Sequence, residues 1–247
     1  MRRANIRSLI YKPFNLLYFA FLIFLLITVA GWFLSFFEGL LVEQLGLPQR
    51  YFWVITLLSL IGSYVNLPLA VLESEGQVPY IEQVESFGVT YEIPKIEVSR
   101  KHTLVMINLG GAIIPTIISL YMFYSIYRFS PNPILTVAKT LVVLVVVTLN
   151  THQSAQIVEG LGITTPAWGP PTMTAFVVFL INYFSPVNYP MQIAYIGGTL
   201  GALIGADLLN LDKIAGVGPV VSIGGAGTFD GVYLTGLVSV LLILIIS

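Results

Sequence analysis

The chain has 247 residues, of which 56% are hydrophobic and only 9% are charged. Soluble domains carry about 25% charged residues, so this composition excludes an ordinary soluble domain and indicates an integral membrane protein. The net charge of -1 gives no reason to expect nucleic-acid binding, and the lack of cysteine excludes disulfides and thiolate chemistry. Two histidines are too few for a zinc site without carboxylates, and we expect neither a bound metal nor a cofactor.

Runs of about 20 apolar residues predict seven membrane spans. The first run follows a basic N-terminus and is long enough to be a retained helix rather than a cleaved signal peptide. We place the spans near residues 15–37, 51–71, 103–127, 132–150, 171–187, 190–210 and 228–246. The predicted fold class is all-α, a polytopic transmembrane helix bundle that forms one integral membrane domain over residues 1–247.

One sizeable polar segment, residues 72–102, separates the second and third spans and is expected to lie outside the membrane. Its pieces 78–84 and 89–93 are rich in β-prone residues and flank Ser86-Phe87-Gly88. We therefore expect a small β-hairpin between spans two and three, lying over the membrane face.

Lysine and arginine set the expected orientation, because they favour the cytoplasmic side. With seven spans, a cytoplasmic N-terminus places eight basic residues inside and three outside. The inner ones are Arg2, Arg3, Arg7, Lys12, Lys95, Arg100, Lys101 and Lys213, and the outer ones are Arg50, Arg128 and Lys139. We expect a multi-pass protein of the cell membrane with its N-terminus in the cytoplasm and its C-terminus outside.

In this topology the residues that interrupt the apolar spans gather towards the inner face. Five of them are candidate substrate-binding residues, namely Asn66, Pro68, His152, Gly225 and Gly227. A histidine titrates near neutrality and can orient a substrate or relay protons, whereas proline and glycine break regular backbone. The simpler interpretation is a set of interfacial turns and a histidine without a catalytic task.

Asp207 is the first of two acids placed in or at the ends of apolar helices. A carboxylate in hydrocarbon costs about 3 kcal/mol or more, so such acids usually mark a site. Asp207 follows a stripe of small residues, Gly197, Gly201 and Gly205, which would let another helix approach closely. Its apolar surroundings oppose ionisation.

Asp230 is the second acid, and it follows the glycine-rich stretch 224–227 near the start of the last span. Free backbone N–H groups at a helix start favour a carboxylate, so Asp230 should ionise more readily than Asp207. Two carboxyl groups with different proton affinities form an acid/base pair, and both are candidate catalytic residues. The alternative is that Asp230 caps its helix while Asp207 is solvated at the interface.

Two resemblances add to this interpretation. The stretches 197–211 and 222–236, with Asn66-Leu67-Pro68-Leu69 and Gly110-Gly111, resemble a family of prokaryotic, largely archaeal, multi-pass membrane proteins of unknown function. That resemblance covers most of the chain and implies a fold relationship without an activity.

The arrangement of the two acids is also similar to that of the intramembrane aspartyl proteases, meaning presenilin, signal peptide peptidase and prepilin peptidase. The resemblance implies that Asp207 and Asp230 are the catalytic pair. Those enzymes place an aspartate directly after Gly-x-Gly, whereas here Thr228 and Phe229 intervene, and their downstream Pro-Ala-Leu element has no counterpart.

Three functions remain open at this point. The first is an intramembrane aspartyl hydrolase acting on a transmembrane peptide, and the second is an ion- or proton-coupled transporter or channel that uses the acids as a cation site. The third is a non-catalytic membrane subunit. Membrane lipids are expected partners in every case, and nothing in the residues indicates an oligomeric state.

Overall fold

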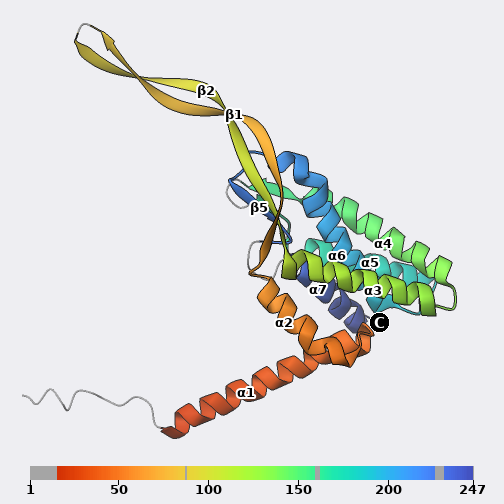
Figure 1. Cartoon of the computed structure of the whole chain (residues 1–247). Helices are drawn as coiled ribbons and strands as arrows, with labels where there is room; N and C mark the ends of the chain where they lie inside the picture. The colour runs from red at the N-terminus through yellow and green to blue at the C-terminus, as the bar shows by residue number, and fades with distance from the viewer. Residues whose placement is uncertain (1–15, 87, 159–161, 226–230, 247) are drawn as a thin grey trace, which may run out of the picture. The chain divides into compact units, whose positions relative to one another are not determined.

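The computed structural model describes residues 16–86, 88–158, 162–225 and 231–246 (Figure 1). The chain forms two compact units, residues 1–52 and 53–247.

The first unit is mainly one apolar helix. Helix α1 (Leu16–Glu38) continues into a π-helical turn, η2 (Gly39–Gln44), and a 3-10 turn, η3 (Gln49–Tyr51), follows. The stretch Tyr18–Gln44 has a mean hydropathy of 2.4 and is long enough to cross a membrane, in agreement with the predicted span 15–37. The side-chain amide of Gln49 donates a hydrogen bond of 2.9 Å to the carboxylate of Glu38.

The predicted second span, 51–71, is wrong as a helix. Helix α2 (Phe52–Gly62) has only 11 residues, and strand β1 (Asn66–Ser86) begins four residues later. Pro68 explains the change, because proline breaks a helix and the residue before it prefers extended backbone. Hydropathy alone does not distinguish an apolar helix from an apolar strand.

Strands β1 and β2 (Val89–Asn108) form an antiparallel hairpin that pairs from Ser86↔Val89 to Asn66↔Asn108. The strands have 21 and 20 residues, so the predicted small hairpin is confirmed in place but wrong in size. Figure 1 shows the hairpin extending away from the helices rather than over them. Strand β5 (Val220–Ile223) pairs in parallel with β2 and completes the sheet order β1-β2-β5, so the fold is helix-rich but not all-α.

The remaining elements of the second unit are mostly helices. After β2 come η4 (Leu109–Ile113), α3 (Ile114–Phe129) and α4 (Pro133–Ser154), then a two-stranded sheet of β3 (Gln156–Val158) and β4 (Gly162–Thr164). Helices α5 (Gly169–Phe184) and α6 (Pro190–Ala202) follow. The chain continues from α6 through η5 (Leu203–Asp207) and η6 (Leu208–Ile214) to β5 and α7 (Gly231–Ile246).

Four helices of the described residues are long and apolar enough to cross a membrane, judged by length and composition. They are Tyr18–Gln44, Leu109–Phe129, Pro133–Ser154 and Pro190–Ile214. Helices α5 and α7 have 16 residues each, below the usual spanning length of about 20, so seven spans are not confirmed. The fold is that of a helix-rich membrane protein.

Helix α6 lies at the centre of the second unit and packs against α3, α4, α5 and α7 (Figure 1). Three glycines face α4, because a Cβ added at Gly197, Gly201 or Gly205 would lie 2.4, 2.7 or 2.4 Å from an α4 atom. On the α7 side, a Cβ at Gly198 would lie 2.7 Å from the hydroxyl of Ser239. Small residues on two sides therefore bring α4 and α7 into close contact with α6.

The sheet and the helices share one apolar core at the base of the hairpin. Its buried members are Val105, Ala112, Ala202, Leu203, Ile214, Val221, Ile223 and Val232. Because these residues come from β2, η4, α6, η5, η6, β5 and α7, the base of the hairpin is held firmly against the ends of the helices.

Candidate functional site at the base of the hairpin

Polar side chains gather where the hairpin meets the helices. Asn108, which ends β2, is 1% exposed, and its amide nitrogen donates to the backbone oxygen of Ser63 at 2.7 Å and to Asn66 Oδ1 at 3.0 Å. Its Oδ1 accepts the N–H of Gly111 at 2.7 Å. The hydroxyl of Ser222, on β5, donates to Asn66 Oδ1 at 2.6 Å. Asn66 and Asn108 therefore join the turn after α2, the hairpin, η4 and β5.

Glycines allow these segments to meet. A Cβ at Gly110 would lie 2.2 Å from the backbone oxygen of Ser59 and 2.4 Å from the backbone nitrogen of Ser63, so α2 and η4 touch through their backbones. A Cβ at Gly224 would lie 2.7 Å from the nitrogen of Ala112. Only residues without a side chain fit at these two positions.

Asp207 lies beside this polar group, at the end of the π-helical segment η5. Its side chain is half-buried, and its Oδ2 accepts the N–H of Gly224 at 2.9 Å. The predicted helix end at residue 210 is close to the observed one, since η6 continues the helical path to Ile214. π-helical turns inside helices occur frequently at functional sites, and this one places a carboxylate against a buried glycine turn.

The turn that binds Asp207 begins the stretch leading to α7. Gly224 and Gly225 have φ angles of +76° and +86°, which favour glycine, and the N–H of Gly225 donates to the oxygen of Ser222 at 3.3 Å. Gly225 thus lies one residue from the Asp207 contact. Gly227 and Asp230 lie outside the described residues, and the separation of the two acids stays a prediction.

Pro68 lies two residues from Asn66, at an irregularity of the hairpin. The register between β1 and β2 shifts between Pro68 and Ala70, and the side chain of Pro68 is exposed. A bulge re-aims nearby side chains, which is consistent with a place next to a site. Its predicted contact with a substrate remains a prediction.

His152 lies in the last turn of α4, on a different flank of η5 from Gly224. A Cβ at Gly205 would lie 3.1 Å from the backbone nitrogen of His152, so Gly205 faces α4. Residues two apart on a helix do not share a face, so Asp207 and Gly205 lie on different faces of η5. The imidazole Nδ1 is buried without a hydrogen-bond partner, as are the hydroxyls of Thr148 and Thr151.

The sequence analysis did not select Asn108 or Ser222 as site residues. Asn108 directly precedes Gly110-Gly111 and closes an apolar strand, and a polar residue at such a junction is a usable signal. Ser222 carried no signal, because its contact with Asn66 joins residues 156 positions apart.

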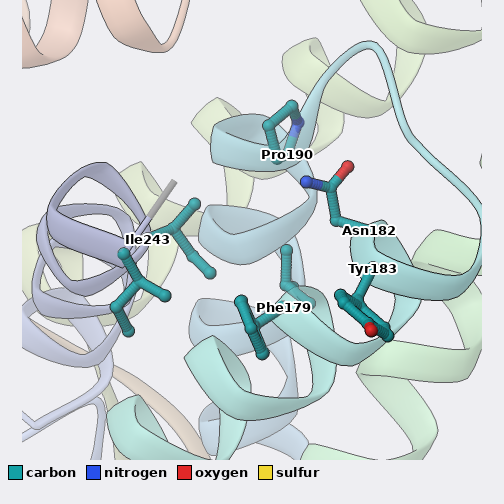
Figure 2. Close-up of a pocket in the computed structure, with 7 residues that line it drawn as sticks. Phe179, Asn182, Tyr183, Pro190 and Ile243 are labelled. Atoms are coloured by element: carbon teal, nitrogen blue, oxygen red, sulfur yellow. The ribbon is translucent and has the colours of Figure 1, made fainter.

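A pocket of about 170 Å³ lies away from this group (Figure 2). It is formed by the ends of α5 and α7 and the start of α6, and its wall is mainly apolar, with Phe179, Tyr183, Pro190 and Ile243. The side chain of Asn182 supplies a polar group, and its Oδ1 accepts the N–H of Val187 at 3.0 Å. Of the predicted site residues that the structure describes, none lines this pocket.

Comparison with known proteins shows the family of this chain. A family described as "Protein of unknown function (DUF1614)" matches residues 60–242, which include the hairpin, helices α3 to α6 and most of α7. No curated protein and no solved structure gives a significant match. Because the match covers well over half of the chain, this protein belongs to that family of unknown function.

Proposed function

We propose that the protein is an intramembrane aspartyl hydrolase with Asp207 and Asp230 as its catalytic pair. One observation carries the proposal, the 2.9 Å hydrogen bond from Gly224 N–H to Asp207 Oδ2. It ties the glycine-rich stretch that precedes Asp230 to the first acid, and Asp230 follows Gly224 by only six residues. Because an extended chain spans at most about 3.5 Å per residue, Gly224 and Asp230 are joined by at most about 21 Å of chain.

The chemistry requires one ionised and one protonated carboxyl group. The ionised group removes a proton from water, whose oxygen forms a bond to the peptide carbonyl carbon while the other carboxyl group protonates the carbonyl oxygen. The C–N bond then breaks as the leaving nitrogen takes the proton that the first carboxyl group removed from water, and the second carboxylate takes back the proton from the former carbonyl oxygen. The half-buried position of Asp207 supports this role, because such a group is accessible to water and yet partly desolvated.

The proposed substrate is the transmembrane segment of a membrane peptide, which reaches the acids at the hairpin end of the helices. Asn66, Pro68 and the turn at Gly225 would contact it there, whereas His152 would act from the α4 side. The distribution of basic residues favours a cytoplasmic location for this end of the helices in the cell membrane. Four basic residues lie at this end, Lys95, Arg100, Lys101 and Lys213, whereas the opposite end has two, Arg128 and Lys139.

The test uses the full chain in liposomes with single-span reporter peptides, whose products are identified by mass spectrometry. Asp207→Asn and Asp230→Asn should each abolish cleavage. Asp212→Asn is the matched control, because Asp212 is an exposed residue of η6, and it should leave cleavage unchanged. Cleavage that survives in either of the first two variants contradicts the proposal. A photoreactive hydroxyethylene inhibitor that crosslinks to no peptide containing or flanking Asp207 or Asp230 would contradict it as well.

Transport is the second candidate, favoured by the buried polar atoms without partners at the end of α4. Thr148, Thr151 and His152 place three such atoms within two helical turns. Buried polar groups without protein partners commonly bind water, and a hydrated path suits proton or cation passage. A proton flux into liposomes that is lost in both Asp207→Asn and Thr151→Val would favour transport. If Asp207→Asn, Asp230→Asn and Thr151→Val all leave the physiological role of the protein unchanged, the protein is a non-catalytic membrane subunit.

A further inference from the structure

The pocket between the ends of α5 and α7 and the start of α6 has a buried apolar floor and an exposed apolar rim (Figure 2). Val178 and Ile243 form the floor, and each is at most 3% exposed. Phe179, Tyr183 and Ile246 belong to the rim, and each is at least 40% exposed. The pocket is therefore open to the surroundings of the protein, and a ligand can enter it from outside.

The size of the pocket limits what can enter it. An apolar cavity of about 150 Å³ binds benzene, so this pocket of about 170 Å³ holds a hydrocarbon segment of about six carbon atoms. A helix with its side chains is about 10 Å across and is too large. The Oδ1 of Asn182 is committed to the N–H of Val187 and is not needed by the ligand. Size and polarity together favour part of one acyl chain.

Lys139, on α4, places a positive charge at the same end of the helices. Its ammonium group donates to the backbone oxygens of Ser185 at 2.7 Å and Pro186 at 3.2 Å. Ser185 follows Tyr183 by only two residues, so the ammonium group lies at the end of the α5 wall of the pocket. Because an ammonium group has three N–H donors, one remains for a ligand.

Arg128, in the last turn of α3, adds a second positive charge. The hydroxyl of Tyr189 donates to the backbone oxygen of Phe129 at 3.1 Å, which holds the end of α3 against the start of α6, where Pro190 lines the pocket. Neither Arg128 nor Lys139 forms an ion pair with a described residue. This end of the helices is positively charged, because residues 121–140, 178–195 and 240–246 contain no Asp or Glu.

We propose that the pocket binds one acyl chain of an anionic phospholipid, whose phosphate lies beside Lys139 in the positive field of Lys139 and Arg128. An acyl chain gains little by leaving other lipid, which is equally apolar, so the headgroup must provide the selectivity. Lysine and arginine form strong charge-assisted hydrogen bonds with phosphate, and basic pockets between membrane helices bind anionic headgroups. A net-neutral lipid would fill the floor but would leave the positive charge of this end uncompensated.

Photolabelling tests where the acyl chain lies. The full chain is placed in phosphatidylcholine vesicles with a trace of phosphatidylglycerol that carries a diazirine near the end of one acyl chain. After illumination and digestion, mass spectrometry should find several-fold more label on residues 178–183 and 243–246 than on residues 134–142 of α4. The α4 segment is a fair reference, because its Ile134, Leu135, Leu141 and Val142 are exposed apolar residues.

Two variants that fill the pocket give the labelling a control. Val178→Phe occupies the floor and should reduce the label several-fold, whereas Val142→Phe, on the exposed surface of α4, should leave it unchanged. If Val178→Phe does not fold, Ile246→Trp at the exposed rim provides the same measurement without changing a buried position. Label spread evenly over the exposed helices, or label that survives in the folded pocket variants, overturns the proposal.

Competition tests the charge of the headgroup. Unlabelled phosphatidylglycerol added to the vesicles should displace the label several-fold more than the same amount of zwitterionic phosphatidylethanolamine. Lys139→Gln and the exposed Arg128→Gln should each weaken this preference, whereas Lys101→Gln, an exposed residue of the hairpin, should not. Equal displacement by the two lipids in the natural chain overturns the proposal. Neither measurement depends on hydrolysis.

Discussion

Helix α6 and the outer part of the hairpin, residues 80–96, are both rich in apolar residues, but most residues of α6 are buried whereas those of the hairpin are exposed. Ten of the 13 residues of α6 are buried among four helices, and its glycines set how closely those helices approach. The hairpin leaves apolar residues exposed on both of its faces, such as Tyr91 on one and Ile81 on the other. Apolar character alone therefore does not indicate burial, which depends on what the fold places opposite each residue.

The largest effect is expected in the core, from Gly205→Ala. A Cβ at this position would lie 2.4 Å from the backbone oxygen of Thr148, and a backbone atom cannot move aside as the end of a side chain can. We expect a loss of about 3 kcal/mol in the free energy of unfolding, measured by denaturant titration in detergent. Gly218→Ala is the control, because its nearest atom would be 3.9 Å away, and a comparable loss there would contradict this explanation.

Asn108→Ala should destabilise the junction between core and hairpin by about 2 kcal/mol, since it leaves the buried N–H of Gly111 and the oxygen of Ser63 unpaired. The midpoint of thermal unfolding measures the effect. Gln83→Ala, on the exposed hairpin, is the comparison and should change the free energy of unfolding by less than about 0.5 kcal/mol. A similar loss of unfolding free energy in both variants would show instead that this part of the hairpin is buried in the purified protein.

Two threonines of α4 sharpen the comparison inside the core. Thr140 and Thr151 are both fully buried. The hydroxyl of Thr140 donates to the backbone oxygen of Thr136 at 2.9 Å, whereas the hydroxyl of Thr151 has no hydrogen-bond partner. Thr140→Val should cost about 1 kcal/mol, whereas Thr151→Val should be neutral or stabilising. A marked loss of unfolding free energy in Thr151→Val instead would indicate an ordered water at that hydroxyl.

The smallest effect is expected on the hairpin, from the titration of Lys95. The hydrogen bond and charge of Glu82 raise the pKa of Lys95 above its ordinary value of 10.5. A pKa of Lys95 that is higher in the folded than in the unfolded chain means that the protonated form stabilises the fold. This contribution to the free energy of unfolding is fully present below pH 10.5, the ordinary pKa of lysine, and is lost as the pH rises through the folded-state pKa. The methyl NMR signal of Ile93, the register partner of Glu82, should shift only above that pH, and Lys95→Met should remove the shift.

Much of the helical part could be predicted from the sequence. The spans at 132–150 and 190–210 correspond closely to Pro133–Ser154 and Pro190–Ile214, because long apolar runs with proline only at the first turn leave few alternatives to a helix in a membrane. The polar segment with β-prone pieces likewise indicated a hairpin between the second and third spans. Asp207 stood out because an acid is rare in such surroundings.

Tertiary structure alone decided how far the hairpin extends and what surrounds Asp207. The ends of β1 and β2 are as apolar as a helix, and their pairing with each other and with β5 over residues 104–107 selects the strand. The contacts of Asn66 with Ser222 and of Asp207 with Gly224 join positions 156 and 17 residues apart. Composition and periodicity describe local preferences, whereas such contacts depend on the packing of whole elements, and no local pattern encodes them.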